Sequence, residues 1–230
     1  MFLKLTILLK GKAFNSLCEF SSCIWRINLS SKTKRVRDKW RSKSWYSVLA
    51  PPYFGNVELG AVPADEPEKL IGRIIDSTLY DVTNDFAHQY LKMYFQITEI
   101  DDKTAKTTFK GHEYSRDYLR SLVRRRTTKV DGLFNITLKD GHKLRVAVSA
   151  FTLSRVRTSQ EKDIRIIMDR ITKEKASALT LDQFAQEMVL GKIASDIYNE
   201  AKMIAPLRHI GIRKSKLVTQ LAQLPLQKAG

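Results

Sequence analysis

Hydrophobic and polar residues alternate with a period of two through much of residues 44–150, a pattern typical of β-strands with one buried face. The clearest example is 89–100, where one side would carry Leu91, Met93, Phe95 and Ile97, and the other Tyr90, Lys92, Tyr94 and Gln96. A turn at 101–103 and a threonine-rich strand at 104–110 follow it. A second hairpin is predicted at 134–150, around the turn-forming pair Asp140-Gly141. With weaker candidates at 44–50 and 72–82, the pattern predicts about six strands.

A helical period interrupts the strands between the two predicted hairpins. Read as a helix from Ser115, this segment places Arg116, Arg120 and Arg124 on one face. The opposite face can pack on a core and carries Tyr118, Leu119, Leu122 and Val123. Arg125, Arg126 and Lys129 continue the positive charge beyond the helix.

Helical periods return after residue 155. The capping-box pattern Thr158-x-x-Glu161 opens a helix whose inward stripe is Ile164, Ile167, Met168 and Ile171. The pattern Thr180-x-x-Gln183 opens another, with Phe184 and Met188 inward. Gly191 breaks that stripe, which resumes at Ile193, Ile197, Ala201 and Ile204 until Pro206.

Strands followed by helices predict an α+β protein: an antiparallel sheet or partly closed β-barrel of about six strands with an inserted basic helix, followed by C-terminal helices. We expect a single globular domain over 38–218, although a division near residue 155 stays open. Residues 1–37 are expected to form a basic N-terminal extension that is flexible or a gene-start artefact, and 219–230 a flexible tail.

The charge of the chain indicates what kind of partner the predicted fold binds. Of the 230 residues 43% are hydrophobic and 28% charged, as in globular proteins, but the net charge is +16. Residues 1–37 carry a net +7 and residues 206–230 a net +5, which leaves +4 for the remainder. Such an excess is usually neutralised by a polyanion. Nucleic acid is the first expected partner, and an anionic membrane surface the second.

Arginine presents a planar fork of donors that suits phosphate oxygens, so the basic segments are the candidate RNA contacts. The predicted RNA-binding residues are Arg116, Arg120, Arg124, Arg125, Arg126 and Lys129, then Lys39, Arg41 and Lys43, then Arg155 and Arg157, and finally Arg213, Lys214 and Lys216. Exposed aromatic residues beside lysines could also stack on bases. Trp40 is such a candidate, Trp45 is expected to anchor the first strand in the core, and Tyr90 and Tyr94 are expected to pack under a helix.

Catalytic and metal-binding patterns are weak, and no catalytic residue, metal ligand or cofactor is predicted. Cys18 and Cys23 supply only half of a zinc shell. His112 beside Glu113 could form an acid–base pair, but a histidine at a strand-to-helix junction more often bonds the backbone. Five acids could gather as the metal site of a nuclease, or merely cap turns: Asp76, Asp81, Asp85, Glu113 and Asp117.

Neither a secretion signal nor an apolar run long enough to cross a membrane is apparent.

The block Lys110-Gly-His-Glu-Tyr-Ser-Arg-Asp-Tyr-Leu-Arg-Ser-Leu-Val-Arg-Arg125 resembles the most characteristic part of the small-ribosomal-subunit protein family of archaea and eukaryotes known as "S three a e". Three further matches accompany it: Asp38–Tyr46 leading to Phe54-Gly55; Gly72-Arg73 through Thr78-Leu79 to Asp85-Phe86; and Gln186-Glu187 through Gly191–Ile197 to Pro206–Arg208. The resemblance spans about residues 38–218 and is similar to the archaeal form, whereas residues 1–30 match nothing in the family.

The resemblance implies a structural component of the small subunit, on the platform near the messenger exit and the 3′ end of the RNA, with a role in translation and no catalytic site. It implies a cytoplasmic ribosomal location with small-subunit RNA and neighbouring small-subunit proteins as partners. We expect one copy per subunit, no homo-oligomer and no membrane. The alternatives are a free-standing RNA-binding assembly or regulatory factor and, less favoured by the sequence, a metal-dependent nuclease.

Overall fold

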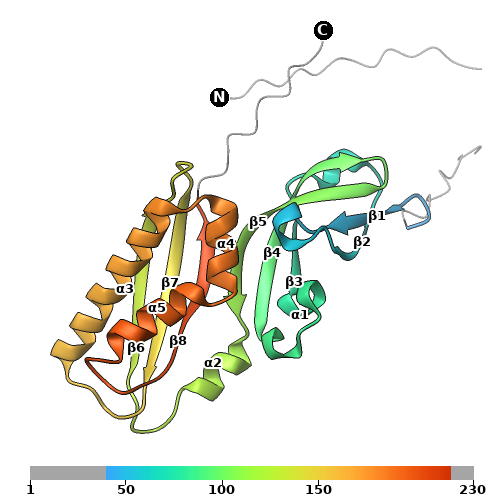
Figure 1. Ribbon diagram of the computed structural model, residues 1–230. Helices are drawn as coiled ribbons and strands as arrows, with labels where there is room; N and C mark the ends of the chain where they lie inside the picture. Colours follow the sequence, from blue (N-terminus) through green and yellow to red (C-terminus); the bar gives the residue numbers. More distant parts are fainter. Residues whose placement is uncertain (1–39, 219–230) are drawn as a thin grey trace, which may run out of the picture. The chain divides into compact units, whose positions relative to one another are not determined.

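The computed structural model describes residues 40–218, so the predictions for 1–37, Lys39, Cys18, Cys23 and 219–230 lie outside the described residues. Within 40–218 the chain forms eight strands and five α-helices (Figure 1). In chain order they are β1 (Ser44–Leu49), β2 (Glu58–Ala64), β3 (Ile74–Thr78), α1 (Leu79–Thr83), β4 (Leu91–Asp101), β5 (Thr104–Tyr114), α2 (Arg116–Leu122), β6 (Lys129–Thr137), β7 (Lys143–Thr152), α3 (Thr158–Ala178), α4 (Leu181–Val189), α5 (Lys192–Ala201) and β8 (Leu207–Leu217).

The strands form one open sheet, and β5 is its centre. The order is β2-β1-β5-β8-β7-β6, while β4 pairs with the other edge of β5 and also with β3. One edge of β5 therefore holds two neighbours. Its first residues pair in parallel with Ser47–Leu49 of β1, and Gly111–Glu113 pair antiparallel with β8. The predicted α+β class with C-terminal helices is confirmed, and the sheet is not closed into a barrel.

The sheet has eight strands and not about six, because the sequence pattern did not predict β2 and β8. The sequence of β2 contains a glycine and a proline, which weaken a strand pattern. The sequence of β8, which follows the helices, is rich in basic residues, and no strand was predicted there. Arg213, Lys214 and Lys216 therefore lie on a strand that pairs with β5 and β7.

The helices α3, α4 and α5 cover one face of the β6–β7–β8 part of the sheet (Figure 1). Their buried residues lie in one apolar cluster with Val146 and Val148 of β7, and include Ile164, Met168, Ile171, Phe184, Met188, Ile193 and Ile197. These are the residues that the helical period predicted to point inward. The capping box was wrong in register, because α3 begins one residue earlier: Arg157 is the N-cap and its N–H donates to Gln160 Oε1 at 3.2 Å.

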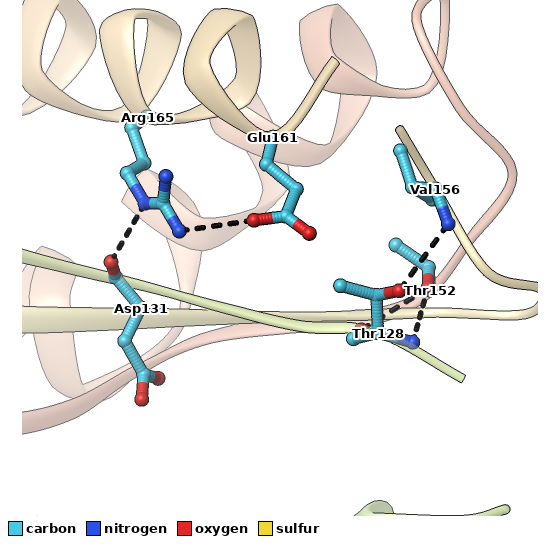
Figure 2. A network of polar contacts seen from close by, with 6 residues as sticks. All are labelled: Thr128, Asp131, Thr152, Val156, Glu161 and Arg165. Atoms are coloured by element: carbon cyan, nitrogen blue, oxygen red, sulfur yellow. Dashed lines mark hydrogen bonds and ion pairs between the residues drawn. The ribbon is translucent and has the colours of Figure 1, made fainter. Parts of the chain in front are cut away.

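A network of polar contacts joins the start of β6, the end of β7 and the start of α3 (Figure 2). The Thr128 N–H donates to Thr152 Oγ1 at 2.9 Å, and the Val156 N–H donates to Thr128 Oγ1 at 3.2 Å. Arg165 of α3 donates to the carbonyl oxygen of Asp131 and to Glu161, each at 3.2 Å. Because Thr152 is fully buried, these contacts fix the two loops that meet at this end of the sheet.

Candidate nucleic-acid interface

The basic helix predicted from Ser115 exists, but it is short. It ends at Leu122, and Val123 has extended backbone angles, so Arg124 leaves the face that carries Arg116 and Arg120. The predicted row of three arginines is therefore wrong at its last member. Val123, which was expected to point inward, is 52% exposed. A helix of seven residues brings only two arginines to one face before the chain turns toward β6.

An aromatic contact holds α2 against the sheet. The Tyr118 ring stacks on Tyr90 of the segment before β4, with centroids 3.9 Å apart and planes at 19°, and Tyr114 meets both rings edge-on. Leu122 is buried at the end of the helix. The prediction that Tyr90 packs under a helix is thus confirmed. Burial raises the pKa of Tyr118 to about 12, so the phenol stays protonated and neutral at neutral pH.

Beside α2 lies a polar hollow of about 490 Å³. Arg116 and Arg120 line it together with Lys92 and Tyr94 of β4 and Glu113 of β5. The Glu113 carboxylate is already paired with Lys214, whose Nζ lies 2.9 Å from Glu113 Oε2. With Glu113 neutralised by Lys214, the basic side chains that line the hollow outnumber its remaining acidic ones. A net positive charge of this kind attracts an RNA phosphate.

The hollow continues onto the sheet face that α3, α4 and α5 leave uncovered. Side chains directly opposite each other on paired strands share a face. Lys92, Glu113, Lys214 and Ala147 follow one another in this way across β4, β5, β8 and β7, and in the neighbouring row Lys216 of β8 lies opposite Arg145 of β7. Lys92, Arg145, Lys214 and Lys216 are exposed.

We call the set Lys92, Lys110, Arg145, Lys214 and Lys216, with Arg116 and Arg120 of α2, the basic sheet face. Lys110 belongs to it because it lies in the β-bulge next to Gly111, the residue that pairs with Lys216. Burial, together with the neighbouring Lys216 ammonium, lowers the pKa of Lys110. Ammonium groups that repel one another favour a bound anion, which relieves the repulsion. Within residues 40–218, Lys92, Lys110 and Lys216 have no carboxylate partner within 4.0 Å.

A second basic group, the loop cluster, comprises Arg124, Arg125, Arg126, Lys129, Arg155 and Arg157. Its members come from two segments far apart in sequence, the loop that leads into the first residue of β6 and the loop before α3, and the hydrogen bonds around Thr128 and Thr152 bring those segments together (Figure 2). All six side chains are exposed. Arg126 has a left-handed backbone with φ of 62°, which turns the chain sharply before β6. Lys129 is partly neutralised by Asp131, with Nζ 2.9 Å from Oδ2.

The remaining predicted contacts lie apart from these two groups or on their border. Arg41 and Lys43 precede β1, where the Lys43 ammonium lies 4.9 Å from the centre of the Trp40 ring. Trp45 does not anchor β1 in the core, because it is 57% exposed and packs edge-on against Trp40. Arg213 lies in the bulge where β8 shifts register against β7. The pKa of the Asp131 carboxyl is lowered by its hydrogen bonds with Ser149 and Lys129, and Arg213 adds to this effect.

His112 serves the fold and not chemistry. It is 1% exposed within β5, with Nε2 3.0 Å from the Ile212 carbonyl oxygen and Nδ1 2.8 Å from Ser215 Oγ on β8. Burial lowers the pKa of His112 to about 4, so the ring is neutral near pH 7. The prediction that it bonds the backbone is confirmed. An acid–base pair with Glu113 is excluded, because successive side chains of a strand point to opposite faces.

The five acids considered for a nuclease do not gather. Asp81 accepts the Thr78 N–H at 2.8 Å in a capping box at the start of α1, and Asp85 caps the turn at 86–88. Within residues 40–218 no group of three or more His, Cys, Asp or Glu side chains could hold a metal ion. The reading that such residues cap turns is confirmed for these two.

Sequence reasoning did not select Lys92, Lys110 or Arg145 as site residues. Lys92 and Arg145 alternate with buried residues of β4 and β7, so a period-two analysis of the polar side of each strand could have found them. Lys110 carried no such signal, because a β-bulge between β4 and β5 decides where it points.

An α+β fold that buries one sheet face under helices and leaves a basic face open is typical of proteins that bind nucleic acid. Comparison with known proteins gives the family. The chain belongs to the Ribosomal S3Ae family, whose sequence profile matches residues 31–220.

Several relatives are called "Small ribosomal subunit protein eS1". The relative from Desulfurococcus amylolyticus is 50% identical over 191 residues, which cover 83% of this chain and 90% of the relative. The relative from Staphylothermus marinus is 49% identical over 183 residues (80% and 86%), and that from Archaeoglobus fulgidus 44% over 200 residues (86% and 95%).

Membership of this family confirms the resemblance seen in the sequence, including its archaeal character. It places the chain among ribosomal proteins and not among enzymes, as predicted. Among the helices in residues 40–218, none is both long and apolar enough to span a membrane.

Proposed function

We propose that the chain is a structural component of the small ribosomal subunit in the cytoplasm, where it binds ribosomal RNA and supports translation. The observation that carries this proposal is the match to relatives named as small-subunit proteins, which runs through the α2 block and most of the fold. The partners are small-subunit RNA and neighbouring small-subunit proteins, with one copy per subunit.

The RNA contacts in this proposal are the basic sheet face and the loop cluster. The first offers Arg116 and Arg120 around a hollow, with further ammonium groups along the sheet. The second presents six exposed cations on two loops that a buried hydrogen-bond network fixes. Phosphate neutralisation by a rigid surface recognises the shape of folded RNA without reading its sequence. Arg41, Lys43 and Arg213 are proposed as further contacts, and Lys39 with them from sequence alone.

Sedimentation of a native lysate through a sucrose gradient tests the proposal. We expect the chain to travel with the small subunit, to remain there after a wash at moderate salt, and to be present at one copy per subunit. A soluble enzyme of the same lysate, followed in parallel, should stay at the top. A chain that also stays at the top, or that is present far below one copy per subunit, would instead fit a free-standing RNA-binding factor.

A further inference from the structure

Three strands lie at the edges of the sheet that residues 40–218 form: β2, β3 and β6. The first contains Gly60 and Pro63 and pairs with β1 through a register shift, and β3 has only five residues. By contrast, β6 has nine residues, contains no proline and pairs with β7 without a register shift. Prolines, bulges and short length are features that keep an edge from pairing with further strands. The edge of β6 lacks all three.

The backbone groups on the outer side of β6 can be identified from the hydrogen bonds at the two ends of its ladder. The Thr152 N–H donates to the Thr128 carbonyl oxygen at 3.0 Å, and the Leu138 N–H donates to the His142 carbonyl oxygen at 2.9 Å. Hydrogen-bonded and free positions alternate along an antiparallel strand, so the even-numbered residues of β6 bond to β7. The odd-numbered residues, from 129 to 137, direct their N–H and C=O groups away from β7.

One of these outward groups already has a partner, which agrees with the direction derived from the ladder. Arg165 of α3 donates to the carbonyl oxygen of Asp131 at 3.2 Å (Figure 2). Further along the strand, the backbone N–H and C=O groups of Leu133 and Asn135 have no hydrogen-bond partner within residues 40–218. A row of unpaired backbone donors and acceptors is a template for another strand.

The side chains of the same stretch are uncharged. Residues 132–138 contain no Asp, Glu, Lys or Arg, although 28% of the chain is charged. Leu133 lies opposite Ala147 at the end of the row that crosses the open sheet face from Lys92, and it is 69% exposed. Uncharged segments of about seven residues with aromatic and β-branched side chains pair readily with further strands. An added strand would also cover Leu133 with the side chain opposite it.

We propose that an extended segment of a neighbouring small-subunit protein adds to the sheet as a further strand along β6, with an apolar side chain beside Leu133. The inference rests on the proposed function, because it assumes that the chain lies in the subunit among other proteins. A polypeptide backbone supplies donors and acceptors in alternation at the spacing of a strand.

The other two candidate occupants fit this edge less well. The phosphate oxygens of RNA can accept from the outward N–H groups, but they cannot donate to the outward carbonyl oxygens. The one cation of β6, Lys129, is already paired with Asp131. A second copy of the chain would bring another net charge of +16 to the contact, and like charges repel.

Hydrogen exchange of single backbone amides tests the proposal on the unaltered protein. Mass spectrometry follows the exchange once in the free full chain and once in purified small subunits. In the free chain, the amides of Leu133 and Asn135 should exchange quickly, while those of Gly132 and Phe134 exchange slowly because they bond to β7. In the subunit, exchange at Leu133 and Asn135 should slow by about tenfold or more. Unchanged rates there, or slow exchange already in the free chain, would overturn the proposal.

Photo-crosslinking identifies what covers the edge. A photoreactive phenylalanine analogue replaces Leu133, and purified small subunits that contain this variant are irradiated. We expect a product with one segment of another small-subunit protein. The matched control carries the same analogue in place of Leu190, which is 56% exposed after α4, and should not give that product. A product with RNA or with a second copy of this chain, no product, or the same product from both positions would contradict the proposal.

Two substitutions at one position separate backbone pairing from side-chain contact. Leu133→Pro removes an outward N–H without removing a hydrogen bond of the β6–β7 ladder, whereas Leu133→Ala shortens the side chain and keeps that N–H. In cells that also make the unaltered chain, we expect Leu133→Pro to enter small subunits about fivefold less than Leu133→Ala. Equal entry would show that the backbone of β6 is not paired. If circular dichroism shows that Leu133→Pro does not fold, the exchange of the unaltered protein decides.

The outcomes separate this inference from the proposed function. A chain that does not sediment with the small subunit contradicts both. A chain that sediments with the subunit, but whose Leu133 and Asn135 amides exchange there as fast as in the free chain, leaves the function standing and shows that the added strand is wrong.

Discussion

At the scale of single residues, His112 is the most informative side chain. Its two ring nitrogens hold partners on β8, and Ser215 Oγ also accepts the His112 N–H at 3.0 Å. The ring therefore stabilises the short pairing between β5 and β8 only while it is neutral. A protonated His112 ring would have no nitrogen left to accept a hydrogen bond, and its charge would be buried in an apolar site without hydration.

The stability of the protein should consequently fall in mild acid. The unfolded chain protonates this histidine near pH 6.5, and the folded chain only near pH 4. Between these values the unfolded state binds more protons, so the free energy of unfolding decreases as the pH falls. We expect a loss on the order of 3 kcal/mol from His112, measured by urea unfolding between pH 7 and pH 4.

His112→Asn is the comparison, because asparagine does not titrate. The variant should be less stable at pH 7 by about 1–3 kcal/mol, since a hydrogen bond is lost. Its unfolding free energy should nevertheless depend less steeply on pH than that of the unaltered chain. The lowered pKa of His209 adds a similar trend to both proteins and cancels in the difference. Parallel pH curves for the two proteins would contradict the role assigned to His112.

At the scale of elements, β8 decides the architecture. It follows the helices in the chain, yet it pairs with β7 along most of its length and with β5 at three residues. It thereby joins the β6–β7 hairpin to the rest of the sheet. It also carries Lys214 and Lys216 onto the basic sheet face.

Gly111 makes this junction possible. A Cβ at Gly111 would overlap the backbone carbonyl oxygen of Ser215 on β8, and a backbone atom in a paired strand cannot move aside. A Cβ at Gly211 would meet the hydroxyl and ring of Tyr114, and a side chain can shift more readily than a backbone held in a strand ladder. We expect Gly111→Ala to reduce the free energy of unfolding by roughly 2–4 kcal/mol, and Gly211→Ala by less. Chemical denaturation of both variants measures the order, and the reverse order would show that β5 and β8 can separate without cost.

At the scale of the whole molecule, the fold distributes the positive charge unevenly between the two sides of the sheet. The helix-covered side of the sheet has cations paired with acids, such as Arg170 with Glu200 and Lys173 with Asp169 on α3. The basic sheet face has cations in excess. Equal numbers of basic residues on the two sides should therefore contribute unequally to RNA binding.

Double variants measure this inequality. Replacing Arg116 and Arg120 with Ala should weaken binding to small-subunit RNA and reduce the slope of log K against log salt by about 0.7–0.9 per lost phosphate contact. The matched control replaces Arg170 and Lys173 with Ala, which removes the same charge from α3 and should leave the slope nearly unchanged. Equal slopes for the two double variants would mean that net charge, and not the basic sheet face, governs binding.

Much of this protein could be predicted from its sequence, because some patterns depend only on neighbouring residues. The alternation at 89–100 and the Asp140-Gly141 turn gave two hairpins correctly, and the helical stripes of α3, α4 and α5 gave the buried residues. The block around α2 gave the family. Net charge gave the chemistry of the partner. These features follow from strand and helix periodicity and from charge, which tertiary contacts do not change.

Only the tertiary structure decided how these parts meet. Three features depend on residues far away in the chain. They are the pairing partners of β8, the β-bulge that places Lys110, and the early end of α2, which removes Arg124 from the face of Arg116 and Arg120. The same is true of the loop cluster, whose two loops join through Thr128 and Thr152, and of the position of β6 at the edge of the sheet. Long-range pairing sets such positions because the burial and hydrogen-bond energy that fixes them comes from the partner segment, which local sequence does not contain.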